Sequence, residues 1–294
     1  MEEFLTLLLA GVSVGAVYGL IAIGLNLTFW TTKTMNFGQG SVMMLCAMLT
    51  ATMIAQGWPQ VLSILAALAV IVVLMVFTET YTVRPALKIE GSMGWAVSTL
   101  GVGIVLQGFA SLWFGSQALA FPDIIFSAID DVVVFGVHMS LQYLAVLVLA
   151  LVLVVAFELL VRGTVWGRAM RAVSMDADLA SVIGIPVRII VLGSYIGSGV
   201  LAGISGILVA QIGGTVDPAF GFELVIFGFV AAVLGGMGST TGALAGGLVA
   251  GVLQQMVGGY ISSAAQHGMA FALLILILVV RPQGLFGQRE VVKV

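Results

Sequence analysis

Residues 5–29 read LTLLLAGVSVGAVYGLIAIGLNLTF and contain no charged side chain. A helix needs about 20 apolar residues to cross roughly 30 Å of hydrocarbon, so this run is long enough to span a membrane. The residues before it, MEEF, are acidic. A cleaved signal peptide would instead begin with basic residues and end at a small-residue cleavage site. We therefore interpret 5–29 as a retained first transmembrane helix.

The rest of the chain has the same character. Its 294 residues are 61% hydrophobic and 8% charged, and the mean hydropathy is +1.22. Soluble domains carry about 25% charged residues. Backbone groups in lipid must pair within their own segment, and long unbroken apolar runs argue against the alternating pattern of a β-barrel. The composition predicts an all-α polytopic membrane protein with about eight to ten transmembrane helices.

Eight further apolar runs are candidate spans, and we treat 1–294 as a single transmembrane domain. The candidates are 38–56, 60–82, 93–114, 138–161, 189–212, 221–235, 240–257 and 264–281. The runs 221–235 and 240–257 are short and are separated by GGMGS. They form either two thin spans or one re-entrant hairpin, and both alternatives leave the tail on the same side of the membrane.

The charges predict the orientation of the chain. All basic residues fall in alternate loops or in the tail: Lys33, Arg84, Lys88, Arg162, Arg168, Arg171, Arg188, Arg281, Arg289 and Lys293. Acidic residues occupy the opposite side: Glu2, Glu3, Asp123, Asp130, Asp131 and Asp217. Because basic loops stay in the cytoplasm, we expect a periplasmic N-terminus and a cytoplasmic C-terminus.

Glycines recur four residues apart in several spans. They are Gly11, Gly15 and Gly19; Gly193 and Gly197; Gly199 and Gly203; Gly242 and Gly246; and Gly247 and Gly251. This spacing places them on one helix face, where two backbones can approach closely, so we expect helix packing there. The first and sixth spans share this glycine spacing and are expected to run in opposite directions, which suggests an inverted repeat of the kind found in transporters.

The spans lack the ionisable groups that ion-coupled carriers use. Glu79, Glu158 and Glu223 all fall near predicted span ends, and Cys46 is the lone cysteine. The sequence contains no H-E-x-x-H motif, no clustered Cys/His spacing and no phosphate-binding loop. An enzyme would need a catalytic constellation within the membrane. We therefore expect either a passive channel or one part of a machine driven by another chain, with no metal site and no nucleic-acid partner.

The most charged segment is 162–188, RGTVWGRAMRAVSMDADLASVIGIPVR. Within it, SMDADLASVIG is typical of a short capped helix. Ser174 is the expected cap, and Gly184 the expected stop, followed by Pro186. The other helix features are two acids in the first turn, Asp176 and Asp178, an apolar stripe, Leu179, Val182 and Ile183, and two upstream arginines, Arg168 and Arg171. By residue chemistry alone, this segment is either a docking element or a solvated loop resting on the head groups.

The stretch GRAMRAVSMDADLASVIGIPV resembles the cytoplasmic coupling loop of ABC-transporter permeases, and more narrowly that of the branched-chain amino-acid permease family. Three other regions are similar to this family in the same order along the chain. They are GAVYGLIAIGLNLTF (15–29) with TMNFGQGSVMMLCAML (34–49), AAVLGGMGSTTGALAGGLVAG (231–251) and RPQGLFG (281–287). Family members commonly have a histidine where this chain has Gln39, and GGTVDPAFGFE (213–223) departs from the family's tyrosine-proline pattern.

The resemblance implies one of two related permease subunits in a bacterial inner-membrane importer. A periplasmic binding protein would deliver branched-chain or other apolar amino acids, and two cytoplasmic ATPase subunits would hold ATP and Mg, leaving this chain without a cofactor. The ATPase-coupling residues would be Arg168, Arg171, Ala172, Ser174, Asp176, Asp178, Leu179, Val182, Ile183 and Gly184. The alternative is a passive channel or secondary carrier for a small neutral solute, such as urea or a short amide.

Seven uncharged amides at membrane depth are candidate pathway residues. They are Asn26, Asn36, Gln39, Gln107, Gln211, Gln254 and Gln255. Such amides can hydrogen-bond a zwitterion without trapping it. They can also form hydrogen bonds between helices, which contribute about 0.6 kcal/mol each on average. Both interpretations remain open for each residue.

Overall fold

The computed structural model describes residues 2–88, 93–126, 131–134, 137–281 and 283–286. Asp130, Arg289 and Lys293, to which the sequence assigns a side of the membrane, lie outside these residues. The described elements are α1 (Glu2–Thr32), α2 (Gln39–Ala55), α3 (Gln60–Phe77), the π-helix η1 (Thr78–Val83), α4 (Arg84–Leu87), α5 (Gly94–Phe114), β1 (Leu119–Ala120), β2 (Asp131–Val134), β3 (Val137–Ser140), α6 (Leu141–Gly163), α7 (Val165–Met175), α8 (Ala177–Val182), α9 (Val187–Gly213), β4 (Thr215–Val216), α10 (Phe220–Gly235), α11 (Thr240–Tyr260) and α12 (Ser263–Val280).

The helical segments agree with the predicted spans. Seven described helical segments are long and apolar enough to cross a membrane, and two shorter apolar helices, α2 and α10, accompany them. One predicted start is wrong, because residues 138–140 belong to β3 and α6 begins at Leu141. The Ser140 hydroxyl accepts a hydrogen bond from the Gln142 backbone N–H at 3.4 Å and so caps α6. The antiparallel pairs β2–β3 and β1–β4 were not expected from the sequence.

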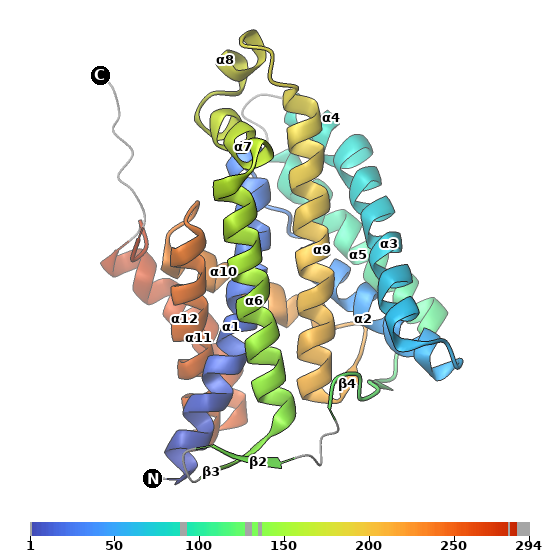
Figure 1. The fold of residues 1–294 in the computed structure, drawn as a ribbon, viewed down its shortest axis with the longest axis vertical. Coiled ribbons are helices and arrows are strands. Elements are labelled where there is room, and N and C mark those ends of the chain that lie inside the picture. Colours follow the sequence, from blue (N-terminus) through green and yellow to red (C-terminus); the bar gives the residue numbers. More distant parts are fainter. Residues whose placement is uncertain (1, 89–92, 127–130, 135–136, 282, 287–294) are drawn as a thin grey trace.

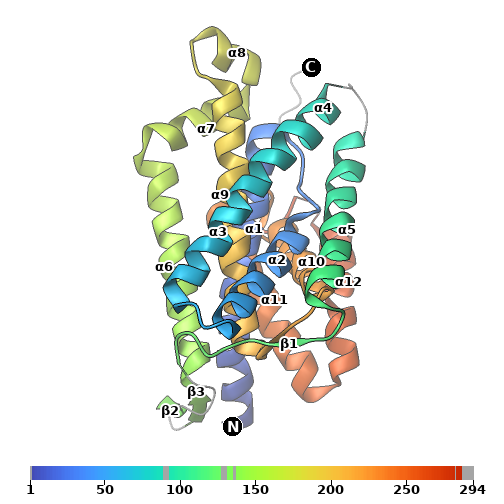
Figure 2. The same cartoon turned by 90° about the vertical axis from the view of Figure 1, so that its right-hand side faces the viewer.

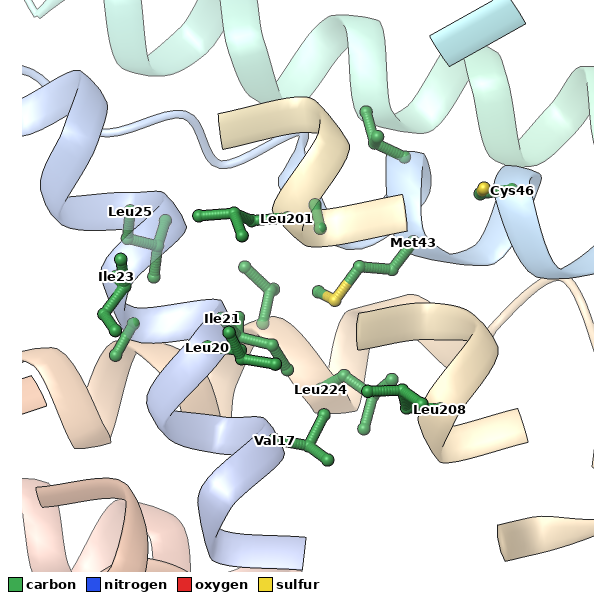
Figure 3. Close-up of a cluster of buried hydrophobic side chains, with 14 of the residues drawn as sticks. Val17, Leu20, Ile21, Ile23, Leu25, Met43, Cys46, Leu201, Leu208 and Leu224 are labelled. Carbon is green, nitrogen blue, oxygen red and sulfur yellow. The ribbon is translucent and has the colours of Figure 1, made fainter. Parts of the chain in front are cut away.

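Helix α1 runs through the middle of the bundle (Figures 1 and 2). It packs against α6, α9, α10 and α11, and every residue from Gly11 to Thr28 except Val12 is buried. Side chains of α1, α2, α9 and α10 meet in one apolar cluster, which includes Ile21, Met43 and Leu208 (Figure 3). The centre of the chain is therefore filled by a helix.

The predicted glycine faces lie at close helix contacts. An added Cβ would lie 2.7 Å from the Val252 Cα at Gly11, 2.7 Å from the Gly247 carbonyl oxygen at Gly15, and 3.0 Å from the Leu244 Cα at Gly19. These three glycines therefore set the approach of α1 to α11. The others contact different neighbours: Gly193 faces Trp166, Gly197 faces Leu27, Gly199 faces Met75, Gly203 faces Cys46, Gly242 and Gly246 face α10, and Gly247 and Gly251 face α1.

Helices α1 and α9 run in opposite directions (Figure 1), and each is followed by a non-helical segment and then a short helix. After α1, Lys33 has φ +55°, non-helical residues follow, and α2 begins. After α9, Gly214 has φ +67°, non-helical residues follow, and α10 begins. Asn36 and Asp217 occupy matching places, four residues before Gly40 and Gly221 respectively. This arrangement agrees with the inverted repeat that the glycine spacing suggests, and the repeat itself stays a prediction.

Two of the described apolar helices are too short to cross a membrane by themselves. Helices α2 and α10, of 17 and 16 residues, are each about 25 Å long and fall short of the roughly 30 Å of hydrocarbon. Each is preceded by a non-helical segment, residues 33–38 for α2 and 214–219, which include β4, for α10. Residues 221–257 comprise most of the short helix α10 and of the longer helix α11, and of these two α11 is long and apolar enough to cross a membrane by itself. The choice between two spans and a re-entrant hairpin stays a prediction.

Helices α4, α7 and α8 lie at the upper end of the bundle in Figure 1, which we call the basic end because most of the described basic residues lie on or beside these helices. Two described basic residues lie in α7, Arg168 and Arg171, and one begins α4, Arg84. The others lie at or just beyond helix ends: Lys33 after α1, Lys88 after α4, Arg162 at the end of α6, Arg188 at the start of α9 and Arg281 after α12. The N-terminus lies at the opposite end. This one-sided distribution is the pattern that the positive-inside rule describes.

Candidate functional site

The charged segment forms two helices at the basic end, and the first, α7, was not expected. The Thr164 hydroxyl caps α7 by accepting a hydrogen bond from the Gly167 backbone N–H at 3.1 Å. Arg171 donates a hydrogen bond to the Val161 carbonyl oxygen at 3.0 Å, which ties α7 to the end of α6. The Arg171 guanidinium thus stabilises the turn, while Arg168 is exposed and Ala172 is partly buried.

The predicted cap of the short helix is wrong. Asp176 is the N-cap of α8, and its carboxylate accepts a hydrogen bond from the Leu179 backbone N–H at 2.9 Å. Ser174 lies in the last turn of α7, where its hydroxyl donates to the Arg171 carbonyl oxygen at 2.8 Å. A serine with helical backbone bonds back to its own helix and cannot cap the next one. Asp178 lies in the first turn of α8, and Gly184 ends the segment with φ +86°.

Helix α8 projects beyond the end of α9 (Figure 1). Its Ala180 side chain is buried against the bundle, whereas Leu179, Val182 and Ile183 are 64%, 82% and 74% exposed. Three large apolar side chains are thus displayed on a short helix at the basic end. Exposed apolar groups that cluster in this way are typical of protein-protein contacts.

A cleft lies where the two short helices begin. The backbones of Gly40 in α2 and Gly221 in α10 are in direct contact, and an added Cβ on either glycine would collide with the other's carbonyl group. Beside this contact is a cleft of about 170 Å³, lined by Phe37, Gly40, Ser41, Leu100, Gly103, Ile104, Gln107, Pro218, Gly221, Phe222 and Val225. Phe222 and Ile104 are 67% and 68% exposed, so the cleft opens at the outer side of α5.

Side-chain hydrogen bonds hold the turns that lead into both short helices. The Asn36 carbonyl oxygen accepts a hydrogen bond from the Gly38 backbone N–H at 3.0 Å. The Asp217 carboxylate accepts from the backbone N–H groups of Ala219 and Phe220, at 2.7 and 3.0 Å. Asx turns of this kind hold non-helical backbone in one conformation. The departure at Asp217 from the family pattern therefore has a structural role.

Of the candidate pathway amides, Gln107 lines the cleft. The amide groups of four others bond elsewhere in the bundle: Asn26 bonds to Gly238 and Ser239, Gln39 to Ile21 and Ser198, Gln211 to Ile124, and Gln254 to Tyr18. Asn36 holds the turn before α2, and its side-chain N–H₂ group is buried without a hydrogen-bond partner among the described residues. Gln255 is partly buried on α11.

The sequence did not identify the apolar members of the cleft. Phe37, Leu100 and Phe222 are ordinary apolar residues in an apolar chain, and no local pattern distinguishes them. The available signal was the matching placement of Asn36 and Asp217 before their glycines. That placement indicates a shared site only when the two short helices are known to be in contact.

The two adjacent glutamines are expected to respond differently to replacement by leucine. Gln254→Leu leaves the Tyr18 hydroxyl, which donates to the Gln254 amide at 2.7 Å, buried without that partner. We expect it to lower the free energy of unfolding by about 1–3 kcal/mol. Gln255→Leu, the matched control, should change it little. Thermal unfolding of the purified chain in detergent measures both. Adding Tyr18→Phe should recover part of the Gln254→Leu loss, and a purely additive double variant would contradict this assignment.

Comparison with known proteins places these features in a family context. The model of the family described as "branched-chain amino acid transport system / permease component" matches residues 7–280. The permease protein LivH of the high-affinity branched-chain amino acid transport system of Salmonella typhimurium is 31% identical over 306 residues, covering 99% of this chain and 98% of the relative. The corresponding protein BraD of Pseudomonas aeruginosa is 32% identical over 303 residues, with the same coverage.

A solved structure has the same overall fold. It is PsaBC from Streptococcus pneumoniae in complex with Fab, and the matching chain has a TM-score of 0.54 and 13% sequence identity. The match covers 96% of this chain and 93% of that one. At this identity the likeness concerns the fold alone.

Proposed function

Since the chain belongs to the family of branched-chain amino-acid transport permeases, we propose that it is a membrane-spanning subunit of a bacterial ATP-driven importer for branched-chain or other apolar amino acids. It would work beside a second homologous permease, two cytoplasmic ATPases and a periplasmic binding protein. ATP and Mg would bind the ATPases and not this chain. The basic end would face the cytoplasm of a multi-pass protein in the inner membrane.

The position of the cleft is the observation that supports this proposal most. A protein that formed a complete pathway alone would enclose polar groups within its own bundle. Here α1 fills the centre of the bundle, and the cleft with Gln107 opens at the outer side of α5. An amide facing lipid at membrane depth is costly. A second permease placed against α5 would cover Gln107 and close the cleft into a pathway between two chains.

The cleft suits the proposed substrates in its chemistry. Most of its wall is apolar, with Phe37, Ile104 and Val225 among the lining side chains. Its polar groups are neutral: the Gln107 amide and the Ser41 hydroxyl, which donates to the Gly103 carbonyl oxygen at 2.9 Å. Neutral donors and acceptors can hydrogen-bond the ends of a zwitterion, and apolar walls can contact its side chain. A pathway of this composition binds weakly, as passage requires.

The route from ATPase to cleft would run through α9. Helix α8 is joined to α9 by Gly184, with φ +86°, and Pro186, which lies next to the first residue of α9. The far end of α9 leads through residues 214–219 into α10, whose first turn forms one wall of the cleft. A partner that moves α8 would therefore tilt α9 and displace the Gly221 side of the cleft relative to Gly40. Discrete rearrangements of packed elements couple distant sites in this way.

Transport by reconstituted vesicles tests the role of the cleft. We expect Gln107→Leu to lower the rate of ATP-dependent leucine uptake by about tenfold, with unchanged membrane insertion, because one amide hydrogen bond to a passing zwitterion contributes about 1.4 kcal/mol. Gln255→Leu is the matched control outside the cleft. Equal rates for both variants would remove Gln107 from the pathway. Leucine flux without ATPase subunits would overturn the importer and favour a passive channel.

A further inference from the structure

A pocket of about 460 Å³ lies at the basic end and shares no lining residue with the cleft or with α8. It is formed by the end of α1, the end of α6 and the start of α11. Its polar lining is made of side chains that all donate hydrogen bonds: Trp30, Lys33, Arg162, Ser239, Thr240 and Thr241. Among the described residues, no carboxylate lines it. Its lining is therefore suited to a ligand that is negatively charged and rich in acceptor oxygens.

Among the described residues, the Lys33 ammonium at the pocket has no carboxylate partner. Arg162 is paired with Glu158, their Nε and Oε1 atoms 2.5 Å apart, and the Thr240 hydroxyl also donates to the Glu158 carboxylate. The negative charge of Glu158 is therefore already matched. In the described part of the chain, Lys33 has no carboxylate partner, and its Nζ lies 5.7 Å from the centre of the Phe29 ring. The Lys33 ammonium is thus available to an anion.

The backbone also favours the binding of an anion in this pocket. Helix α11 begins at Thr240, and its positive dipole end faces the pocket. The Trp30 indole nitrogen packs against Gly238, where an added Cβ would lie 3.1 Å from it. The rings of Phe29 and Phe286 line the rest of the pocket. Tryptophan and basic side chains together are typical of the level at which a membrane protein meets lipid head groups.

We propose that this pocket binds the phosphate group of an anionic phospholipid. Phosphate offers several acceptor oxygens to a surrounding set of hydroxyls, a cation and a helix start, and basic pockets between transmembrane helices bind anionic head groups in this way. The site joins α1, α6 and α11, so a bound lipid would hold together three helices around the turn at 236–239. The proposal does not depend on the transported substrate.

The test must remove the charge of Lys33 without straining its backbone. Lys33 has φ +55°, and asparagine is among the side chains that tolerate this conformation best. We therefore choose Lys33→Asn, with Lys88→Asn as the matched control, because Lys88 is an exposed lysine at the same end and does not line the pocket. A second variant, Thr241→Val, removes a hydroxyl from the pocket and leaves Lys33 in place.

Native mass spectrometry of the full-length chain in detergent measures binding of phosphatidylglycerol, phosphatidylcholine and inorganic phosphate. We expect phosphatidylglycerol to bind most tightly, Lys33→Asn to weaken it about fivefold, and Lys88→Asn to leave it unchanged. Thr241→Val should weaken it by a smaller factor, which keeps the test valid if Lys33→Asn fails to fold. Displacement of the lipid by millimolar inorganic phosphate would identify free phosphate as a second source of the same ligand chemistry.

Two results would overturn the proposal. The first is equal retention of phosphatidylglycerol by the normal chain, Lys33→Asn and Thr241→Val. The second is unchanged lipid retention together with loss of co-purifying ATPase in Lys33→Asn. That outcome would assign the pocket to an acidic group of a protein partner.

Discussion

Replacing residues 176–183 by a Gly/Ser linker of equal length is expected to abolish ATPase binding and ATP-dependent uptake. The exchange removes the Asp176 cap and the three exposed apolar side chains of α8, Leu179, Val182 and Ile183. Each such side chain contributes about 1.5–3 kcal/mol when it is fully buried, so loss of all three should weaken ATPase affinity by at least about a hundredfold. Pull-down from the native membrane in mild detergent, compared with the normal chain at equal insertion, measures the effect.

A second variant tests the exposed apolar side chains separately from the helical conformation of α8. Leu179→Gln combined with Val182→Gln and Ile183→Gln keeps the Asp176 cap and the Gly184 stop but removes the apolar side chains. We expect the same loss of ATPase, whereas Ser181→Ala, on the same helix, should retain it. If the ATPases remained bound to the linker variant, α8 would not be the coupling element. Recovery of the normal chain without partners, as a stable homo-oligomer, would contradict the proposal that it is an importer subunit.

Gly221→Val is expected to have the second large effect, because it separates the two short helices at their point of contact. A Cβ at Gly221 collides with the Gly40 backbone carbonyl, which cannot rotate away as a side chain can. Overpacking in such a place costs on the order of 3 kcal/mol. We expect a clear drop in thermal unfolding temperature in detergent and loss of uptake in vesicles.

The matched control is Gly108→Val on α5, where an added Cβ meets nothing within 4 Å. It should unfold at the temperature of the normal chain. Gly221→Ala already adds the colliding Cβ, so we expect it to lower both the unfolding temperature and the rate of uptake, by less than Gly221→Val does. Equal unfolding temperatures for Gly221→Val and Gly108→Val would show that the Gly40–Gly221 contact does not hold the cleft.

Local chemistry determined much of this protein. Apolar runs of about 20 residues and the breaks between them predicted the membrane class and nearly every helix, and glycine spacing predicted the face of α1 that α11 approaches. Gly184 and Pro186 indicated the end of the charged segment. Each of these features depends on residues within a few turns of one another, so the sequence alone is sufficient. The error at Ser174 was also local, because the pattern did not show that α7 continues as far as Met175.

Only the tertiary structure decided which residues line the cleft and the pocket at the basic end. Gln39, Gln107 and Gln254 are equivalent as amides in an apolar chain, yet Gln39 bonds inside the bundle, Gln254 bonds to Tyr18, and Gln107 lines the cleft. The contact of Gly40 with Gly221, and the convergence of Lys33, Arg162 and Thr240, bring together segments far apart along the chain. Such neighbours depend on how whole helices pack, because a side chain at membrane depth takes whichever partner the facing helix presents. The contact between the two short helices therefore places the cleft, and no single stretch of the sequence contains that information.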